Sequence, residues 1–140
     1  MSVKDIRSTL ETRAANVAVI SGNGTTNGVS IDTADHELGT MFTVSVGNYT
    51  DGTYNFTLDE STTGAFGGEE VAILDGSDKL IGTLADLELT AVTANNDILP
   101  SIGVISNKQF LRLNAVATSV STGADVLALV TQMGEEMPTV

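Results

Sequence analysis

Apolar and polar side chains alternate residue by residue through much of this 140-residue chain, in short runs separated by turns. The clearest example is the segment 41–59, in which two alternating runs flank an Asp51-Gly52 pair. Successive side chains of a β-strand point to opposite faces, so a period of two predicts strands that are half buried. Asp-Gly between two such runs is typical of a tight β-turn. We therefore expect a β-hairpin over residues 41–59.

The same pattern recurs often enough to predict an all-β fold, a jelly-roll-like β-sandwich of about eight short strands. Turn-rich segments such as SGNGTTNG (21–28) and STTGAFGG (61–68) separate the strands. Pro100 interrupts the run 98–105, which indicates an edge strand because proline cannot donate a ladder hydrogen bond. The side chains expected in the core are Phe42, Val44, Tyr54, Phe56, Phe110, Leu111, Leu113, Leu127 and Leu129.

The N-terminal segment differs from the rest because its apolar residues recur at helical spacing. Val3, Ile6, Leu10 and Ala14 are three, four and four residues apart, which places them on one face of a helix. We therefore expect a short helical arm at the N-terminus. The expected organisation is an arm over 1–15, a β-sandwich domain over 16–134 and a polar tail over 135–140.

The arm is also the basic part of an acidic chain. Lys4, Arg7 and Arg13 are three of the six lysine and arginine residues, and the whole chain has a formal net charge of −12. The apolar stripe of the arm is too small to fold alone, so the arm must dock on its own sandwich or on a neighbouring molecule. Arg112, in an apolar strand, either faces solvent or pairs with a carboxylate such as Asp125 of a neighbour. The predicted interface residues are Lys4, Ile6, Arg7, Leu10, Arg13 and Arg112.

Charge and composition disfavour several classes of partner. The acidic balance repels phosphate backbones, so we expect no nucleic-acid partner. The chain has no cysteine, which excludes disulfides, thiolate metal sites and cysteine nucleophiles. No apolar run approaches the roughly 20 residues of a membrane helix, and the N-terminus does not have the pattern of a signal peptide. We therefore expect neither a membrane partner nor export by a signal peptide.

Candidate catalytic and metal-binding residues are few. His36 is the only histidine, and its acidic neighbours are typical of a solvated loop. The adjacent carboxylates Asp59-Glu60, Glu69-Glu70 and Glu135-Glu136 would point to opposite faces of a strand, whereas the catalytic pair of a glycosidase must face one substrate. The segment 75–78 begins like a calcium loop, but no acid completes the spacing. We therefore predict a protein that is not an enzyme, with no cofactor and no bound metal.

Three segments together resemble a family of small structural proteins of tailed bacteriophages. The first, VKDIRSTLETRAANVAVI (3–20), has a charged arm before an apolar strand. The second, VSIDTADHELGTMFTVSVGNYTDGTYNFTLDES (29–61), has an Ile-Asp pair, an apolar strand, a tight turn and a strand that ends in Glu-Ser. The third, IGVISNKQFLRLNAVATSVSTGADVLALVTQMGEEMP (102–138), has a turn, an arginine-bearing strand and a final apolar strand before a proline. Residues 62–97 have no counterpart in the resemblance.

The resemblance implies a β-sandwich head protein, most plausibly one that decorates or cements the outer shell. It departs from the family pattern in the turn Ser106-Asn107-Lys108, where the family tends to have glycine, and at Phe110, where tyrosine is usual. The implied partner is the major capsid protein, and the implied assembly is a homo-oligomer, with a trimer favoured. The implied location is the virion surface, after assembly in the host cytoplasm.

Other functions stay open at this point. A tail or head–tail connector protein is compatible with the sequence, because a long hairpin over 41–59 suits the inner ring of a tail tube. A carbohydrate-binding sandwich needs exposed aromatic rings, for which Tyr49, Tyr54 and Phe66 are the candidates. A small hydrolase is the weakest alternative, since the chain has a single histidine and no G-x-S-x-G motif.

Overall fold

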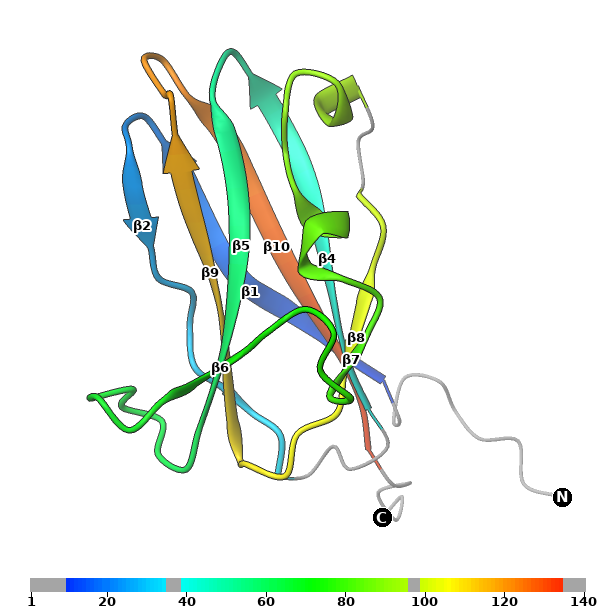
Figure 1. Cartoon of the computed structure of the whole chain (residues 1–140). Helices are drawn as coiled ribbons and strands as arrows, with labels where there is room; N and C mark the ends of the chain where they lie inside the picture. The colour runs from blue at the N-terminus through cyan, green and yellow to red at the C-terminus, as the bar shows by residue number, and fades with distance from the viewer. Residues whose placement is uncertain (1–9, 35–38, 96–98, 135–140) are drawn as a thin grey trace, which may run out of the picture.

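The computed structural model describes residues 10–34, 39–95 and 99–134. These residues form two antiparallel β-sheets packed face to face (Figure 1). Sheet A has the strand order β1-β10-β4-β8-β7, and sheet B has the order β2-β9-β5-β6, with β3 also paired to β9. The strands are β1 (Leu10–Ile20), β2 (Gly24–Thr26), β3 (Ile31–Asp32), β4 (Gly39–Tyr49), β5 (Thr53–Ser61), β6 (Val71–Ile73), β7 (Leu80–Ile81), β8 (Ile102–Val104), β9 (Phe110–Thr118) and β10 (Ala124–Met133). Two short 3₁₀ helices, η1 (Leu84–Leu87) and η2 (Thr93–Asn95), lie between β7 and β8.

The strand order is that of a jelly roll. The first strand pairs with the last in sheet A, and β2 pairs with the penultimate strand β9 in sheet B. The chain crosses from one sheet to the other at β1–β2, β3–β4, β4–β5, β6–β7, β8–β9 and β9–β10, so its apolar strand faces meet across a single core. The prediction of an all-β, jelly-roll-like sandwich is therefore confirmed. None of the helices in the described ranges is long and apolar enough to span a membrane.

The prediction of a helix over residues 2–14 is wrong where the structure describes the segment. Leu10–Ala14 is the first half of β1, and each of its residues pairs with β10. Leu10, Thr12 and Ala14 share one face of the strand, opposite Met133, Thr131 and Leu129. A short helix with a narrow apolar stripe buries little, whereas pairing with a ten-residue strand gives hydrogen-bond partners to the backbone groups on the β10 side of Leu10–Ala14. The sandwich therefore begins at Leu10 instead of residue 16, and residues 1–9 lie outside the described ranges.

The predicted hairpin over residues 41–59 is also wrong, although both of its strands exist. β4 lies in sheet A and β5 in sheet B, so the turn between them is an arch that connects the two layers. The alternating rows of β4 and β5 face each other across the core, with Phe42 and Val44 on one side and Tyr54 and Phe56 on the other. The turn at Asp75-Gly76 likewise connects the two layers, because β6 belongs to sheet B and β7 to sheet A.

Most of the predicted core is buried. Phe42, Val44, Tyr54, Phe56, Leu111 and Leu113 are each at most 3% exposed. The prediction fails in β10, where Val126, Ala128 and Val130 point inward while Leu127 and Leu129 are half-buried on the outer face. It also fails at Phe110, which is half-buried on the outer face of β9. The side chains of β10 are apolar on both faces, so alternation alone does not indicate which face is inside.

The Asp51 side chain links the β4–β5 arch to the loop between β9 and β10 through hydrogen bonds. Its carboxylate accepts hydrogen bonds from the backbone N–H groups of Ser121, Thr122 and Gly123, at 2.9–3.2 Å. The bonds from Gly123 and Thr122 hold the pKa of Asp51 below its ordinary value, because they stabilise the charged form. These loops, together with the β1–β2 loop, form the end that we call the turn pole, at the top of Figure 1.

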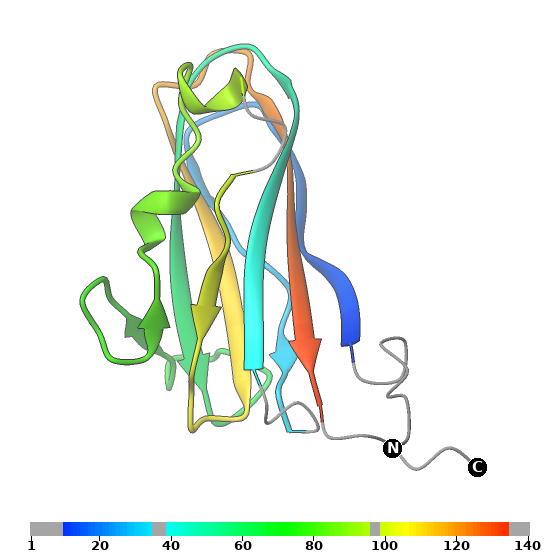
Figure 2. The same cartoon turned by 90° about the vertical axis from the view of Figure 1, so that its right-hand side faces the viewer.

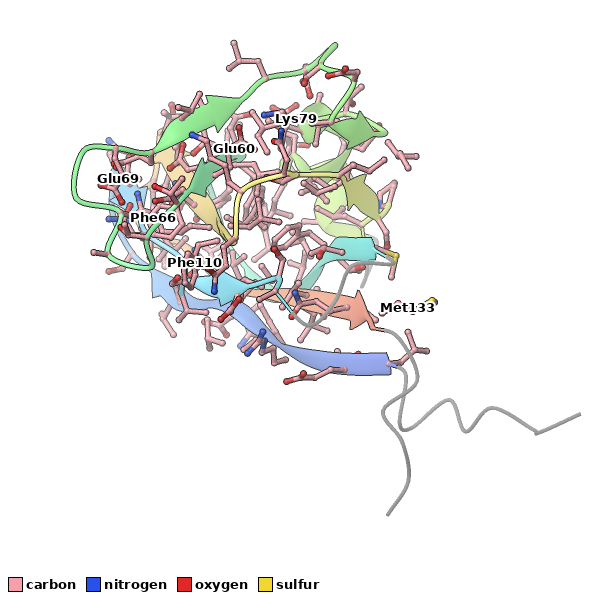
Figure 3. The ribbon with its side chains drawn as sticks, turned by 90° about the horizontal axis from the view of Figure 1, so that it is seen from below. Glu60, Phe66, Glu69, Lys79, Phe110 and Met133 are labelled. Atoms are coloured by element: carbon pink, nitrogen blue, oxygen red, sulfur yellow. The ribbon has the colours of Figure 1, made fainter. Side chains whose placement is uncertain are left out.

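The opposite end, which we call the terminal pole, contains both the start of β1 and the end of β10 (Figures 1 and 2). Glu60 is 2% exposed there, and its carboxylate accepts hydrogen bonds from Lys79 Nζ and from Ser106 Oγ. Figure 3 shows Lys79 directed toward Glu60. Burial by itself raises the pKa of Glu60, but the hydrogen bonds from Lys79 and Ser106 and the charges of Lys79 and Lys108 outweigh it and lower the pKa. The ion pair connects β5 to the segment just before β7.

Candidate docking surface

The outer face of sheet A is a broad surface of apolar and hydroxyl side chains. Figure 2 shows β8, β4, β10 and β1 of this sheet side by side. The pairing register places the outward residues in rows across the strands, so that Val17 lies beside Leu127, and Met41 beside Thr131 and Gly103. We call this surface face A; it consists of Leu10, Thr12, Ala14, Val17, Val19, Met41, Thr43, Ser45, Ile81, Gly103, Asp125, Leu127, Leu129, Thr131 and Met133.

Face A is almost free of charge. Among its described residues, Asp125 is the one charged side chain, and it lies at the end near the turn pole, where its carboxylate accepts a hydrogen bond from Asn48 Nδ2 at 3.2 Å. Thr12 and Thr131 are hydrogen-bonded to each other through their hydroxyl groups at 3.1 Å. Val17 and Val19 are 69% and 79% exposed, which is unusual for adjacent valines on one strand face. A contiguous apolar surface of this kind marks an interaction site more often than a random surface does.

The outer face of sheet B has the opposite character. Arg112 Nη2 lies 3.4 Å from Asp59 Oδ2 and 3.8 Å from Glu70 Oε1, and the guanidinium is 4.3 Å from the centre of the Phe66 ring. Asn114, which is 3% exposed, donates to the same Asp59 oxygen at 2.8 Å. The loop between β5 and β6 covers this network, so the charges of this face are satisfied within the chain.

The environment of Arg112 therefore differs from both interpretations of the sequence, which were exposure to solvent and an ion pair with a neighbouring molecule. Its side chain lies on the outer face of its strand but is only 15% exposed, because the loop containing Phe66 covers it. The predicted partner is a carboxylate of a neighbouring molecule, such as its Asp125, whereas the described ion pairs of Arg112 are with Asp59 and Glu70 of its own chain. Arg112 serves to hold the β5–β6 loop, and we do not retain it as an interface residue.

The other predicted interface residues divide between the described and the undescribed parts of the chain. Arg13 Nη2 donates to Gln132 Oε1 at 2.7 Å and to the Asp32 carbonyl at 3.3 Å, so Arg13 connects β1 to β10 and β3. Leu10 is 37% exposed on face A, beside Met133. The remaining residues, Lys4, Ile6 and Arg7, lie outside the described ranges.

Glu69 shapes the loop that covers Arg112. Its carboxylate accepts hydrogen bonds from Thr63 Oγ1, from Ser61 Oγ at 2.7 Å and from the backbone N–H of Gly67 at 3.0 Å. Figure 3 shows Glu69 and Phe66 close together at one side of the molecule, away from Met133. The hydrogen bonds from Thr63 and Ser61 lower the pKa of Glu69 from 4.5 to about 2, because they favour the ionised form.

We expect the chemical shift of the Gly67 amide proton to change with a midpoint near pH 2, because this amide donates a hydrogen bond to the Glu69 carboxylate, which titrates there. Because the pKa is lower in the folded state, the stabilisation by Glu69 is present above pH 4.5 and is lost as the pH falls toward 2. The measurement is an NMR pH titration of wild type and of Glu69→Gln, in which the low-pH shift of Gly67 should be absent. A midpoint near 4.5 in the wild type would show that the hydrogen bonds to Glu69 do not form.

Candidate metal-binding side chains lie apart from one another among the described residues. No group of three His, Cys, Asp or Glu side chains comes together in the described ranges. Asp59 points to the outer face and Glu60 to the interior, as expected for adjacent carboxylates on a strand. A hollow of about 510 Å³ near the terminal pole is lined by Thr40, Ser106 and Lys108 among others. Its lining includes Ala34 and Gly39, and the residues between them in the sequence, His36 among them, lie outside the described ranges, so we assign the hollow no ligand.

Sequence reasoning missed face A. The signal was present in β10, whose sequence ADVLALVTQM is apolar at both odd and even positions. The exposed Val17 and Val19 gave a second signal, because they alternate with the more buried Ala18 and Ile20 in β1. Apolar residues on both faces of an antiparallel strand indicate a surface that is covered on both sides.

Comparisons with known proteins do not assign the chain to a family. No protein-family model matches it, and no curated protein matches it. Among solved structures, it is similar to the crystal structure of dimeric latent PorU from Porphyromonas gingivalis, with a TM-score of 0.37 and 14% sequence identity. The match covers 94% of this chain and 14% of the PorU chain, so the chain spans only a small part of that protein. A similarity at this level indicates neither a family nor a function.

Proposed function

We propose that this chain is a structural protein of a tailed-bacteriophage head, a decoration protein that binds the outer surface of the major capsid protein lattice. The proposal rests on the position in the fold of the three segments that resemble tailed-bacteriophage structural proteins. The segments 3–20, 29–61 and 102–138 supply β1, β3 to β5 and β8 to β10, which are the framework of the sandwich. The unmatched residues 62–97 supply the short strands β6 and β7 and the two 3₁₀ helices, and they contribute Ile73, Leu87 and Leu89 to the core.

The architecture is compatible with this role. Double-sheet jelly rolls occur in viral capsid domains and in lectins, although a fold does not determine a function. The chain presents an uncharged sheet face and otherwise carries an excess of carboxylates. Such a protein functions by surface contact, and the proposal includes no catalysis, cofactor, nucleic acid or membrane.

Two alternative functions lose their main support. A tail-tube protein was plausible because of the predicted hairpin over 41–59, but these strands belong to different sheets. A carbohydrate-binding module was plausible because of three aromatic side chains, of which Tyr54 is fully buried and Phe66 is 8% exposed. Tyr49 alone is half-buried and donates its hydroxyl hydrogen bond to the Gly52 carbonyl. Decoration of the shell is therefore the function that we favour, with the virion as the location.

The terminal pole is the end that we propose faces the shell. β1 begins there with Leu10, and the preceding segment contains Lys4, Ile6 and Arg7. Basic and apolar side chains on this segment suit an acidic and apolar groove on a lattice of capsid subunits. Many copies per particle would add avidity to a modest contact, and a homo-oligomer would add more.

The proposal is tested by deleting residues 1–9 and measuring co-sedimentation with empty shells of the phage that encodes the chain. The full chain should saturate the shells with a fixed number of copies per capsid subunit. The deletion should reduce binding at least about tenfold, whereas thermal melting should be unchanged because β1 is intact. A deletion through residue 14 is unsuitable, because it removes half of a strand that pairs with β10.

A matched control removes residues 135–140, which follow β10 at the same pole. This deletion should leave shell binding unchanged, because it removes no basic side chain. Failure of the full chain to bind shells would overturn the proposed function. Full binding by the 1–9 deletion would show instead that another surface is the anchor.

A further inference from the structure

We propose that face A binds face A of a second copy of this chain, forming a two-fold symmetric pair in which two sheets pack face to face. This inference does not depend on the phage assignment, because it uses only the geometry and charge of the described residues. Two-fold pairs are the commonest assembly of identical chains, and they require a surface that is complementary to itself. The argument concerns three properties of face A, which are its charge, its shape and its size.

The charge of face A selects the kind of partner. Twelve of the 18 carboxylates belong to described residues, and Asp125 is the one that lies on this face. A partner with a basic surface would bury its cations opposite uncharged valine, leucine and threonine, which costs free energy without compensation. The complementary surface must therefore also be uncharged and apolar. A second copy of face A has that composition.

The shape of face A suits another sheet. The three strands β1, β10 and β4 are ten or eleven residues long, and they form an antiparallel ladder with register shifts between Ala14 and Asn16 in β1 and between Ala124 and Val126 in β10. Two such faces stack about 10 Å apart, with their strands at about 30° or near a right angle. The β-branched side chains of Val17, Val19 and Thr131 lose little rotamer entropy when they are covered.

The size of face A is adequate for a moderate interface. Strands lie about 4.8 Å apart and rise about 3.3 Å per residue, so the three long strands cover roughly 500 Å² of flat area. β8 and β7 extend the face further through Gly103 and Ile81, the latter 64% exposed. Stable interfaces bury about 800 Å² per partner, so we expect a dissociation constant in the micromolar range, not a permanent dimer.

Salt dependence gives this interface a distinctive signature. Each copy has a net charge of −12, so two copies repel each other at a distance, although Asp125 is the one charged side chain among the described residues of each contact surface. Salt screens this repulsion, with a Debye length of about 10 Å at 0.1 M and about 3 Å at 1 M. Association through face A should therefore strengthen as salt is added. Binding to a basic partner would weaken under the same conditions.

The test is sedimentation velocity on the full chain, over about 10–500 µM protein and at about 0.02 and 0.5 M NaCl. The expected result is a concentration-dependent rise from the chain mass of 14.5 kDa toward twice that mass, which is larger at high salt. Val17→Lys and Val19→Lys should each weaken association at least about tenfold. Both side chains are largely exposed, so these variants should retain the melting temperature of the wild type.

The matched control is Asn55→Lys, which adds the same charge on the outer face of sheet B. This control should associate as the wild type does, because it changes the net charge but not face A. A chain that stays at 14.5 kDa under all conditions, or that reaches three times this mass, would overturn the face-to-face pair. Equal association by Val17→Lys and Asn55→Lys would overturn it as well. Loss of shell binding by Val17→Lys in a monomeric protein would assign face A to the shell and leave the proposed function intact.

Discussion

Phe56→Ala is expected to lower the free energy of unfolding by about 3–5 kcal/mol. Phe56 is 3% exposed, and its ring fills the core between the two sheets. Its cross-strand neighbour on the inner face is Ala115, which is too small to fill the space that the ring leaves. Removing the ring therefore loses apolar burial and leaves a cavity, and both effects lower stability in the same direction. Urea denaturation followed by circular dichroism measures the change.

Asn55→Ala is the matched control for this substitution. Asn55 is the preceding residue of β5, and its side chain is exposed on the outer face of sheet B. Its replacement should change the free energy of unfolding by less than about 0.5 kcal/mol. A similar loss in both variants would mean that β5 has the opposite register, with Asn55 inside and Phe56 outside.

Lys79→Met should be the most destabilising substitution of a charged residue described above, with a loss of about 2–3 kcal/mol at neutral pH. The Lys79 side chain is 33% exposed, whereas that of Glu60 is only 2% exposed. Removing the ammonium group therefore leaves a nearly buried carboxylate with only its bond from Ser106. Breaking a fully buried ion pair costs about 3–5 kcal/mol, and access of water to Lys79 reduces this figure.

The pH dependence of this variant distinguishes a lost charge partner from lost packing. In the wild type the pKa of Glu60 lies below its ordinary value of 4.5, so its stabilisation is present above pH 4.5 and is lost as the pH falls through the lowered value. Without Lys79 the pKa of Glu60 rises, because burial still raises it while the hydrogen bond and the charge that lowered it are gone. The gain in stability between pH 3 and 6 should therefore be smaller in Lys79→Met than in the wild type.

Two further variants complete the comparison. Lys108→Met makes the same substitution at a lysine whose charge has the smallest effect on the pKa of Glu60, so it should cost less than about 0.5 kcal/mol. The double variant Glu60→Gln, Lys79→Met should lose less free energy of unfolding than the sum of the two single losses, because it removes both partners of the ion pair. Additive losses would mean that Lys79 and Glu60 do not interact in the folded protein.

Most of the strands were predictable from the sequence, but their partners were not. The alternation around Phe42 and Phe56 indicated two strands correctly, because period-two burial is a local property. The turn at Asp51-Gly52 then suggested a hairpin, whereas the structure has an arch between sheets. Both arrangements bury the same alternating rows, so the pattern does not distinguish them. The difference depends on Asp51, whose carboxylate binds backbone N–H groups about 70 residues away in the chain.

The candidate surface was less predictable than the fold. The helical spacing of Ile6 and Leu10 predicted a helical arm. Leu10 instead pairs with Met133 in a β-ladder, which stabilises this residue more than a narrow apolar helix face would. Arg112 had the composition of an interface residue, yet its partners Asp59 and Glu70 become neighbours only when the β5–β6 loop folds over the sheet. Face A combines residues from the two ends of the chain, and a local pattern does not show that they meet.

The pairing of β1 with β10 also has a consequence for synthesis on the ribosome. β1 is made before every other described strand of the sandwich, and the strand that pairs with it along its length is the last one. Sheet A therefore closes only after the whole sandwich has emerged, and until then Val17, Val19 and Ile20 have no partner strand within the sandwich. Topologies that depend on such distant pairing have a high contact order and fold slowly, over milliseconds to seconds. The polar, glycine-rich segment after β1 helps the nascent chain to stay soluble during this delay, because it interrupts the apolar run next to the unpaired strand.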